Sequence, residues 1–273
     1  MANGVTPDDL ALGGLRLVRG RLGDWLAEIG RVTTMMLETT QASLERLPSA
    51  RLVVQQMAAI GVDSLWLVIV VSVFTGAVAA VQAAYQFTAV VPLKYLSGVI
   101  LRSVVIELGP VLTALVIGGR VGASIAAELG TMKVTEQIDA LRAMGISPMR
   151  YLVAPRVIAA IVMLPILTVY ADAIAILGGY IVAVTSLNVS APTYVQGLRE
   201  FFHMKDLLSG LLKAMFFGGI IGTMGCHNGF ATEGGAEGVG AATTRAVVAA
   251  CVLVLISDYV LANVLLRFIV AQQ

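Results

Sequence analysis

Few residues in this chain could perform covalent chemistry, and two of them are adjacent. Cys226 and His227 are neighbours, and the other histidine is His203. Neighbouring side chains on a helix point about 100° apart, so they rarely form a nucleophile and base pair. The second cysteine, Cys251, completes neither a CxxC spacing nor a disulfide framework. The sequence therefore predicts a protein that is not an enzyme and that has no metal site.

Nucleotide binding by this chain is also not expected. No GxxxxGK[ST] motif is present, and none of the four lysines follows a glycine: Lys94, Lys133, Lys205 and Lys213. The stretch GGAEGVG at residues 234–240 resembles a phosphate cradle, but the sequence gives no strand before it. We therefore expect no cofactor in this chain, and we expect any ATP and Mg²⁺ on a partner subunit.

A charged stretch, VTEQIDALRAMGIS at residues 134–147, stands between two very apolar regions. Thr135 is an acceptable helix N-cap, Gly145 suits the position just past the helix end, and Pro148 forbids continuation. The apolar residues share one face and the charged ones spread over the rest: Val134, Ile138 and Leu141, then Glu136, Asp139 and Arg142. Such a helix can seat its apolar face in a partner's groove, or it can be an ordinary solvated loop helix.

Composition indicates what surrounds these residues. The 273 residues are 58% hydrophobic and 13% charged, with a mean hydropathy of +0.89, whereas an ordinary soluble domain is about 25% charged. The apolar runs reach the roughly 20 residues that a helix needs to cross a bilayer, without the alternation of a membrane barrel. The net charge of +1 gives no reason to expect a nucleic acid partner. The sequence predicts an all-α, multi-pass membrane protein.

We expect five membrane-spanning helices in one transmembrane domain, residues 51–273. The spans are expected at residues 64–90, 108–132, 151–187, 207–227 and 243–269, with Asp63 as the cap of the first. A helical piece at 95–105 is too short to cross alone. The stretch 151–187 would be about 55 Å long as a helix, so it is either one kinked helix or a hairpin turning near Gly178 and Gly179. Residues 188–206 and 228–242 are expected to be loops.

The N-terminal arm, residues 1–50, is expected to hold an amphipathic helix in the membrane interface. Its apolar residues recur at helical spacing: Leu22, Trp25, Leu26, Ile29, Val32 and Met36. Packing on a soluble partner is the alternative. Basic residues are more frequent in this arm and around residues 133–156 than in the loop 188–206, so we place the arm and the helix at 135–145 in the cytoplasm. Five spans then leave the C-terminus outside.

Seven charged residues lie within or at the ends of the expected spans: Glu107, Arg120, Glu128, Asp172, Lys213, Arg245 and Asp258. Such residues are functional candidates because a charge in lipid is costly. Arg120 and Glu128 are expected to pair with neighbouring helices or to reach the cytoplasmic interface. Lys213 is expected to reach the interface with its ammonium, and Asp258 to bond across a helix interface. Glu107, at the helix start beside Pro110, is our candidate for a lipid headgroup contact, with a simple cap charge as the alternative.

The outer end of the first span could line an apolar cavity for acyl chains. Tyr85, Gln86 and Phe87 stand there beside small alanines, and the turn through Pro92 can bring them to the depth of Glu107. We therefore predict that these three residues and Glu107 bind lipid. The alternative is that they are bulk facing the bilayer.

Three motifs in order give the chain a family resemblance. ELGPVLTALVIGGRVGASIAAELGTMK, EQIDALRAMGISPMRYLVAPR and GGAEGVGAATTRAVV resemble the MlaE/YrbE family of ABC transporter permeases over nearly all residues from about Arg51 onward. The resemblance implies a homodimer in the bacterial inner membrane, with a coupling helix that docks on a cytoplasmic ATPase. It assigns ATPase docking to the segment that contains Glu136, Gln137, Asp139, Leu141 and Arg142.

The resemblance also implies partners and a substrate. The partners are an MlaF-like ATPase, an MCE-domain (MlaD-like) protein across the membrane and often an STAS-domain (MlaB-like) protein. The substrate is glycerophospholipid moved between the inner and outer membranes. In one respect the chain departs from the family, because Ile106 stands where members often have an arginine before the glutamate of ELGP.

A proton-coupled secondary transporter is the alternative function. It would use intramembrane carboxylates such as Asp172 or Glu107. Inverted repeats would mark such a protein, and the two halves of the sequence show no convincing repeat.

Overall fold

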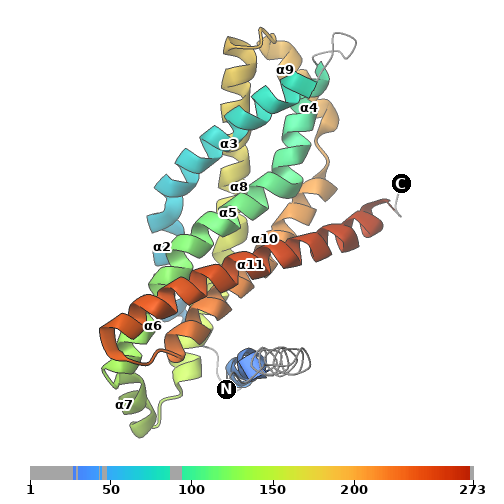
Figure 1. The fold of residues 1–273 in the computed structure, drawn as a ribbon. Coiled ribbons are helices and arrows are strands. Elements are labelled where there is room, and N and C mark those ends of the chain that lie inside the picture. The colour runs from blue at the N-terminus through green and yellow to red at the C-terminus, as the bar shows by residue number, and fades with distance from the viewer. Residues whose placement is uncertain (1–26, 29, 43, 45–47, 87–93, 271–273) are drawn as a thin grey trace, which may run out of the picture.

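The computed structural model describes residues 27, 28, 30–42, 44, 48–86 and 94–270. Within these residues five helices are long and apolar enough to cross a membrane: Ala50–Gln86, Tyr95–Val134, Met149–Thr185, Met204–Phe230 and Gly235–Leu265. The predicted all-α membrane fold with five spans is therefore confirmed. The short helices α7 (Gln137–Ala143) and α9 (Ala191–Phe201) lie at opposite ends of the bundle (Figure 1).

The first span is longer than predicted. It comprises α2 (Ala50–Gly61), one 3₁₀ turn (Val62–Ser64) and α3 (Leu65–Gln86) without interruption. Asp63 therefore does not cap the start of the span but lies in a turn inside it. Gly61 has helical φ and ψ angles of −82° and −67°, so the chain continues through it without a break.

The second span joins two segments that the sequence seemed to separate. It consists of α4 (Lys94–Ser103), the π-helical segment η2 (Val104–Leu108), α5 (Gly109–Ile117), the π-helical segment η3 (Gly118–Gly122) and α6 (Ala123–Val134). The predicted separate piece at 95–105 is therefore wrong. Pro110 lacks a backbone N–H and crowds the carbonyl four residues before it, and the wider π turn of η2 absorbs that defect without ending the helix.

The third span is a single helix, and the hairpin alternative is wrong. It contains the π-helical segment η4 (Met149–Val153) and α8 (Ala154–Thr185), with Pro165 inside. Gly178 does not form a turn but allows α3 to approach. A Cβ on Gly178 would lie 2.4 Å from the Val73 carbonyl oxygen, and a Cβ on Gly76 would lie 1.7 Å from that of Ala175. The two helices therefore pack backbone against backbone.

The predicted polar loop 188–206 contains α9. Its N-cap is Ser190, whose hydroxyl accepts a hydrogen bond from the Thr193 N–H at 3.4 Å. The helix packs on α4 and α8 through aromatic contacts, with ring centroids 5.6 Å apart for Tyr95 and Phe201 and 5.4 Å apart for Tyr180 and Tyr194. Burial of its apolar face stabilises a helix that the polar composition concealed.

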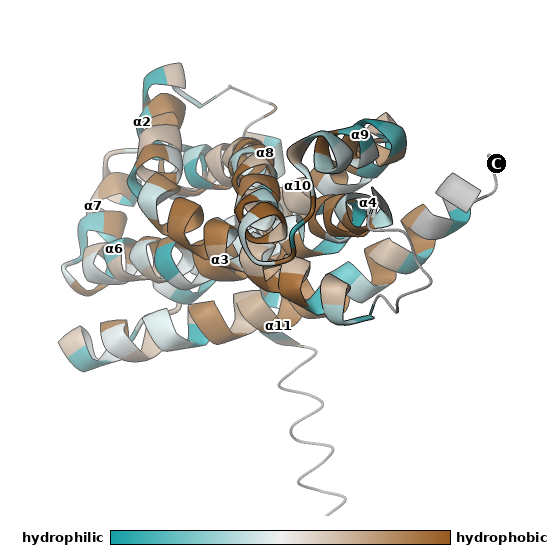
Figure 2. Ribbon diagram, turned by 90° about the horizontal axis from the view of Figure 1, so that it is seen from above, coloured by the Kyte–Doolittle hydropathy of each residue, from teal (hydrophilic) through white to brown (hydrophobic). Residues whose placement is uncertain are grey.

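The last two spans are α10 (Met204–Phe230) and α11 (Gly235–Val270). The fourth span agrees with the prediction, but the Gly-rich segment is not a loop, because α11 already begins at Gly235. The connection is short and turns at Gly234 and Gly235, whose φ angles are +86° and +72°. Many residues of α10 are buried. In contrast, α11 runs along one edge of the bundle (Figure 2), and its large apolar side chains include many exposed ones.

The described residues between 27 and 44 are helical and contact α10. The Thr223 hydroxyl donates to the sulfur of Met36 at 3.1 Å, and His227 Nε2 lies 2.6 Å from a carboxylate oxygen of Glu28. Val32 packs against the main hydrophobic core. The other members of the predicted apolar stripe, Leu22, Trp25, Leu26 and Ile29, lie outside the described residues, so the interfacial position of this helix stays a prediction.

Candidate functional site

A short helix, α7, forms where the coupling helix was predicted, between the second and third spans at one end of the molecule (Figure 1); its coupling role stays a prediction. Thr135 is not its N-cap, because its hydroxyl donates back to the Thr131 carbonyl at 2.8 Å. The N-cap is Glu136, which adopts a left-handed conformation with a φ of +59°. The C-terminal end is as predicted. Gly145 has a φ of +73°, and its N–H donates to the Arg142 carbonyl at 3.0 Å.

The apolar face of α7 packs against the chain itself. Ile138 is fully buried in the main hydrophobic core, and Leu141 is partly buried against the same core. The bundle thus covers Ile138, whereas Val134 is 38% exposed, so docking of this face on a partner stays a prediction. The side chains of Glu136, Gln137 and Arg142 are exposed instead.

Two ion pairs fix the charged side of α7. Lys133 Nζ at the end of α6 lies 3.1 Å from one carboxylate oxygen of Asp139, and Arg142 lies 3.1 Å from the other. The Lys133 hydrogen bond is the main reason that the pKa of Asp139 falls below its usual value. Asp139 thus ties α7 to α6, and it leaves Glu136 and Gln137 as the exposed polar groups at the helix start.

Three charged residues from three elements meet inside the bundle. Lys213 of α10 places its ammonium 2.7 Å from Glu107 of η2 and 3.0 Å from Asp258 of α11. The Lys213 side chain is only 1% exposed, so the expectation that it reaches the interface is wrong. The position before Glu107 holds Ile106, and Glu107 receives its cation from a different span. We call these three residues the lysine triad.

The sequence indicated each member of the lysine triad as a charge in a span, but not their association. One physical argument was available: an unpaired charge in lipid is costly, so a lysine inside a span should pair with a carboxylate from another span. Two other predicted charges are also paired. Arg156 donates to Glu128 at 2.9 Å, and Arg120 donates to the Ser64 hydroxyl at 2.6 Å.

The predicted lipid-binding residues are not brought together into one site. Tyr85 and Gln86 line an apolar groove of about 590 Å³, which the side chains of α3 and Val182 of α8 form. Tyr85 is 93% exposed. Glu107 does not line this groove but belongs to the lysine triad. Phe87 lies outside the described residues. We call the surface lined by Tyr85, Gln86 and Val182 the α3 groove.

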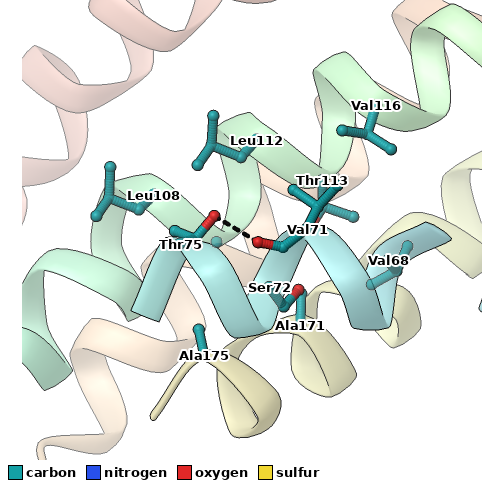
Figure 3. Close-up of a pocket in the computed structure, with 11 residues that line it drawn as sticks. Val68, Val71, Ser72, Thr75, Leu108, Leu112, Thr113, Val116, Ala171 and Ala175 are labelled. Carbon is teal, nitrogen blue, oxygen red and sulfur yellow. Dashed lines mark hydrogen bonds between the residues drawn. The ribbon is translucent and has the colours of Figure 1, made fainter. Parts of the chain in front are cut away.

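A much smaller cavity lies between α3, α5 and α8 (Figure 3). Its volume is about 10 Å³, which suits one water molecule and excludes a lipid. Ser72, Thr75 and Thr113 supply hydroxyl groups to its lining, and the Thr75 hydroxyl donates to the Val71 carbonyl at 2.8 Å. The cavity is therefore a packing feature of closely spaced helices.

The geometry defines a multi-pass helical membrane protein with five spans, a buried lysine paired with two carboxylates, and a short helix between two spans. The family model described as Permease MlaE matches residues 53–264. The chain belongs to this family of ABC transporter permeases, which work with an ATPase subunit.

Relatives agree with this assignment. A probable ABC transporter permease protein of Rickettsia typhi is 44% identical over 79% of this chain and 83% of its own length. A probable ABC transporter permease protein of Synechocystis is 40% identical over 76% of this chain and 79% of its own length. The Arabidopsis thaliana protein TRIGALACTOSYLDIACYLGLYCEROL 1, chloroplastic, is 36% identical over 77% of this chain and 60% of its own length.

Proposed function

We propose that this chain is the permease subunit of an ABC transporter that moves glycerophospholipids between the inner and outer membranes of a bacterium. Two copies form a homodimer in the inner membrane. An MlaF-like ATPase binds ATP and Mg²⁺ and supplies the energy. An MCE-domain (MlaD-like) protein receives or delivers lipid on the far side, and an STAS-domain (MlaB-like) protein often completes the assembly.

The α3 groove is the observation that carries the lipid substrate. Its lining is apolar apart from Gln82, Tyr85 and Gln86, and its volume of about 590 Å³ falls in the range typical of small-molecule sites. An acyl chain fits apolar walls, and the amide and phenol groups suit the polar part of a lipid. The name of the Arabidopsis relative, which is that of a diacylglycerol glycolipid, also supports a lipid cargo.

We assign ATPase docking to the exposed side of α7, which presents Glu136, Gln137 and Arg142. Leu141 and Asp139 act indirectly, because Leu141 packs on the core and Asp139 holds α7 to Lys133. A displacement of α7 by the ATPase would move the second and third spans together, because α7 joins the end of α6 to the start of η4.

For the second copy, α11 offers a suitable surface. Its exposed large apolar residues include Val248, Val252, Leu255, Ile256 and Tyr259. An apolar helix face of this kind can pack on a partner helix or contact lipid. In the proposed homodimer, part of this apolar face of α11 packs against the second subunit.

A photo-crosslinking residue at Tyr85 tests the substrate assignment in the complex reconstituted with its ATPase. We expect a phospholipid adduct at Tyr85 whose yield changes when ATP is hydrolysed. Phe74 is the matched control, because it is 67% exposed on the same helix but does not line the groove. Equal lipid capture at both positions, unaffected by ATP, would contradict the assignment.

A further inference from the structure

The carboxyl group of Asp172 on α8 is buried inside the bundle without a partner. The residue is 4% exposed, and each carboxyl oxygen has less than 1 Å² of accessible surface. Neither oxygen has a hydrogen-bond partner within the described part of the chain. An ionised carboxylate in such a place is so costly that the group takes up a proton, unless a cation or a donor compensates the charge.

The surroundings of Asp172 exclude a bound ion or molecule at the carboxyl group. A Cβ on Gly109, the first residue of α5, would overlap Asp172 Oδ1, so the carboxyl group fills the space that a side chain of α5 would take. An oxygen with almost no accessible surface cannot contact a ligand. The compensating group must therefore belong to the chain or be a proton.

The cations of the neighbouring elements do not compensate Asp172. This part of α8 is packed by α3, α4, η2, α5, α9 and α10, and α3 and α5 contain no charged residue. The titratable groups described on the others and in the link to α10 are Tyr95, Arg102, Glu107, Tyr194, Arg199, Glu200, His203, Lys205, Asp206 and Lys213.

Each cation in that set is either paired elsewhere or exposed. Arg102 donates to Asp206 at 3.1 Å, and Lys213 lies 2.7 Å from Glu107. Arg199 and Lys205 are exposed, and no ion pair with Asp172 is found in the described residues. A proton is the compensating group that remains.

The backbone next to Asp172 favours a proton as well. The Val104 carbonyl oxygen of η2 would lie 3.0 Å from the same Cβ position on Gly109 that Oδ1 would overlap. A carboxylate and a carbonyl are both acceptors, so they repel each other when they are close. A neutral carboxylic acid has an O–H donor for such a carbonyl.

We propose that Asp172 is a proton-binding site, which holds its proton while α8 packs against α5 and releases it when the two helices separate. In the packed state the acid O–H donates to a carbonyl oxygen of η2. Separation admits water, the O–H bond breaks, and the proton passes to water and leaves a hydrated carboxylate. A movement of the third span against the second is thereby coupled to proton release, whichever substrate the chain transports.

Infrared spectroscopy of the purified full chain tests the protonation state directly. All aspartates are isotopically labelled at the side-chain carboxyl carbon, and the spectrum of labelled Asp172→Asn is subtracted. A protonated carboxyl group absorbs at a higher frequency than a carboxylate, so we expect an acid band at neutral pH that the variant lacks. Absence of this band from the unmodified chain would overturn the proposal.

The melting temperature gives an independent measurement, because asparagine resembles the neutral acid and cannot ionise. An aspartate in the unfolded chain loses its proton at about pH 4, whereas the folded chain keeps the proton on Asp172. The folded state then binds more protons than the unfolded state, so the unmodified chain loses stability relative to Asp172→Asn as pH rises. We expect Asp172→Asn to melt higher, by about 3–5 °C for each pH unit above about pH 4 until the folded chain ionises.

Asp206→Asn is the matched control. Asp206 is 5% exposed, like Asp172, but its carboxylate accepts the hydrogen bond from Arg102. Its replacement should therefore lower the melting temperature at neutral pH, which is the opposite sign. An Asp172→Asn chain that does not fold or melts lower than the unmodified chain would overturn the proposal, because the amide reproduces the neutral acid. So would a difference that does not grow with pH.

Discussion

Removal of the lysine in the lysine triad should destabilise the bundle more than removal of either acid. Lys213→Met leaves two carboxylates without their cation, and breaking a buried ion pair in this way costs about 3–5 kcal/mol. Glu107 is 41% exposed and Asp258 is 20% exposed, so solvent screening favours the lower end of that range. Glu107→Gln should cost only about 1 kcal/mol, because Lys213 keeps Asp258 at 3.0 Å.

These free energies convert to melting temperatures that can be measured. For a chain of this size, 1 kcal/mol shifts the melting temperature by about 2–4 °C. We therefore expect a loss of about 6–12 °C for Lys213→Met and about 2–4 °C for Glu107→Gln. The chain carries its own reporter, because Cys226 is fully buried and becomes reactive on unfolding. A thiol-reactive fluorophore in a Cys251→Ser background follows unfolding in detergent.

The double variant Lys213→Met with Asp258→Asn supplies the control. It removes the cation and the less exposed acid together, so it should recover part of the stability that Lys213→Met loses. The electrostatic explanation fails if Glu107→Gln lowers the melting temperature as much as Lys213→Met. It also fails if the double variant is no more stable than Lys213→Met.

Three further predictions concern other parts of the chain. Gly178→Leu should separate α3 from α8, because even a Cβ there would lie 2.4 Å from the Val73 carbonyl oxygen; we expect loss of folded protein in size-exclusion chromatography, and Gly119→Leu, where a Cβ would meet nothing within 4 Å, should be milder. Glu136→Lys should weaken ATPase binding without changing the melting temperature, since the side chain is exposed; unchanged copurification would remove Glu136 from the docking surface. The pKa of Asp139 is lowered, so its contribution is present above its ordinary pKa and is lost as pH falls through the lowered value; the protection factors of the α7 amides, which correct hydrogen exchange for its intrinsic pH dependence, should fall at that acidic pH but should not change in Asp139→Asn.

The sequence predicted those features that depend on local composition. The five spans follow from apolar runs of sufficient length, and the end of α7 follows from Gly145 and Pro148. Both features depend only on residues that are close together in the sequence. The helix α9 was missed because its composition is polar, although Ser190 followed by Pro192 is a helix start signal.

Features that depend on partners distant in the sequence could not be predicted. The environment of Glu107 is decided by Lys213 and Asp258, which lie on two other helices. The apolar face of α7 could equally meet a partner or its own bundle, and only packing shows that Ile138 is already buried. A glycine pair inside an apolar stretch is equally ambiguous. At Gly178 it permits close helix packing and not a turn.

The prolines of the spans show how a local defect can be kept without ending a helix. Pro110 and Pro155 each follow a π-helical segment, η2 and η4 respectively, by two residues. In each case the carbonyl that the proline ring would crowd, four residues earlier, lies inside the π turn, where the backbone is wider. Pro165 lies inside α8 without such a turn, so a proline alone does not produce one. The π turn of η2 carries Glu107 to the lysine triad. The same proline that suggested a helix boundary therefore marks the segment that brings a carboxylate to the buried lysine.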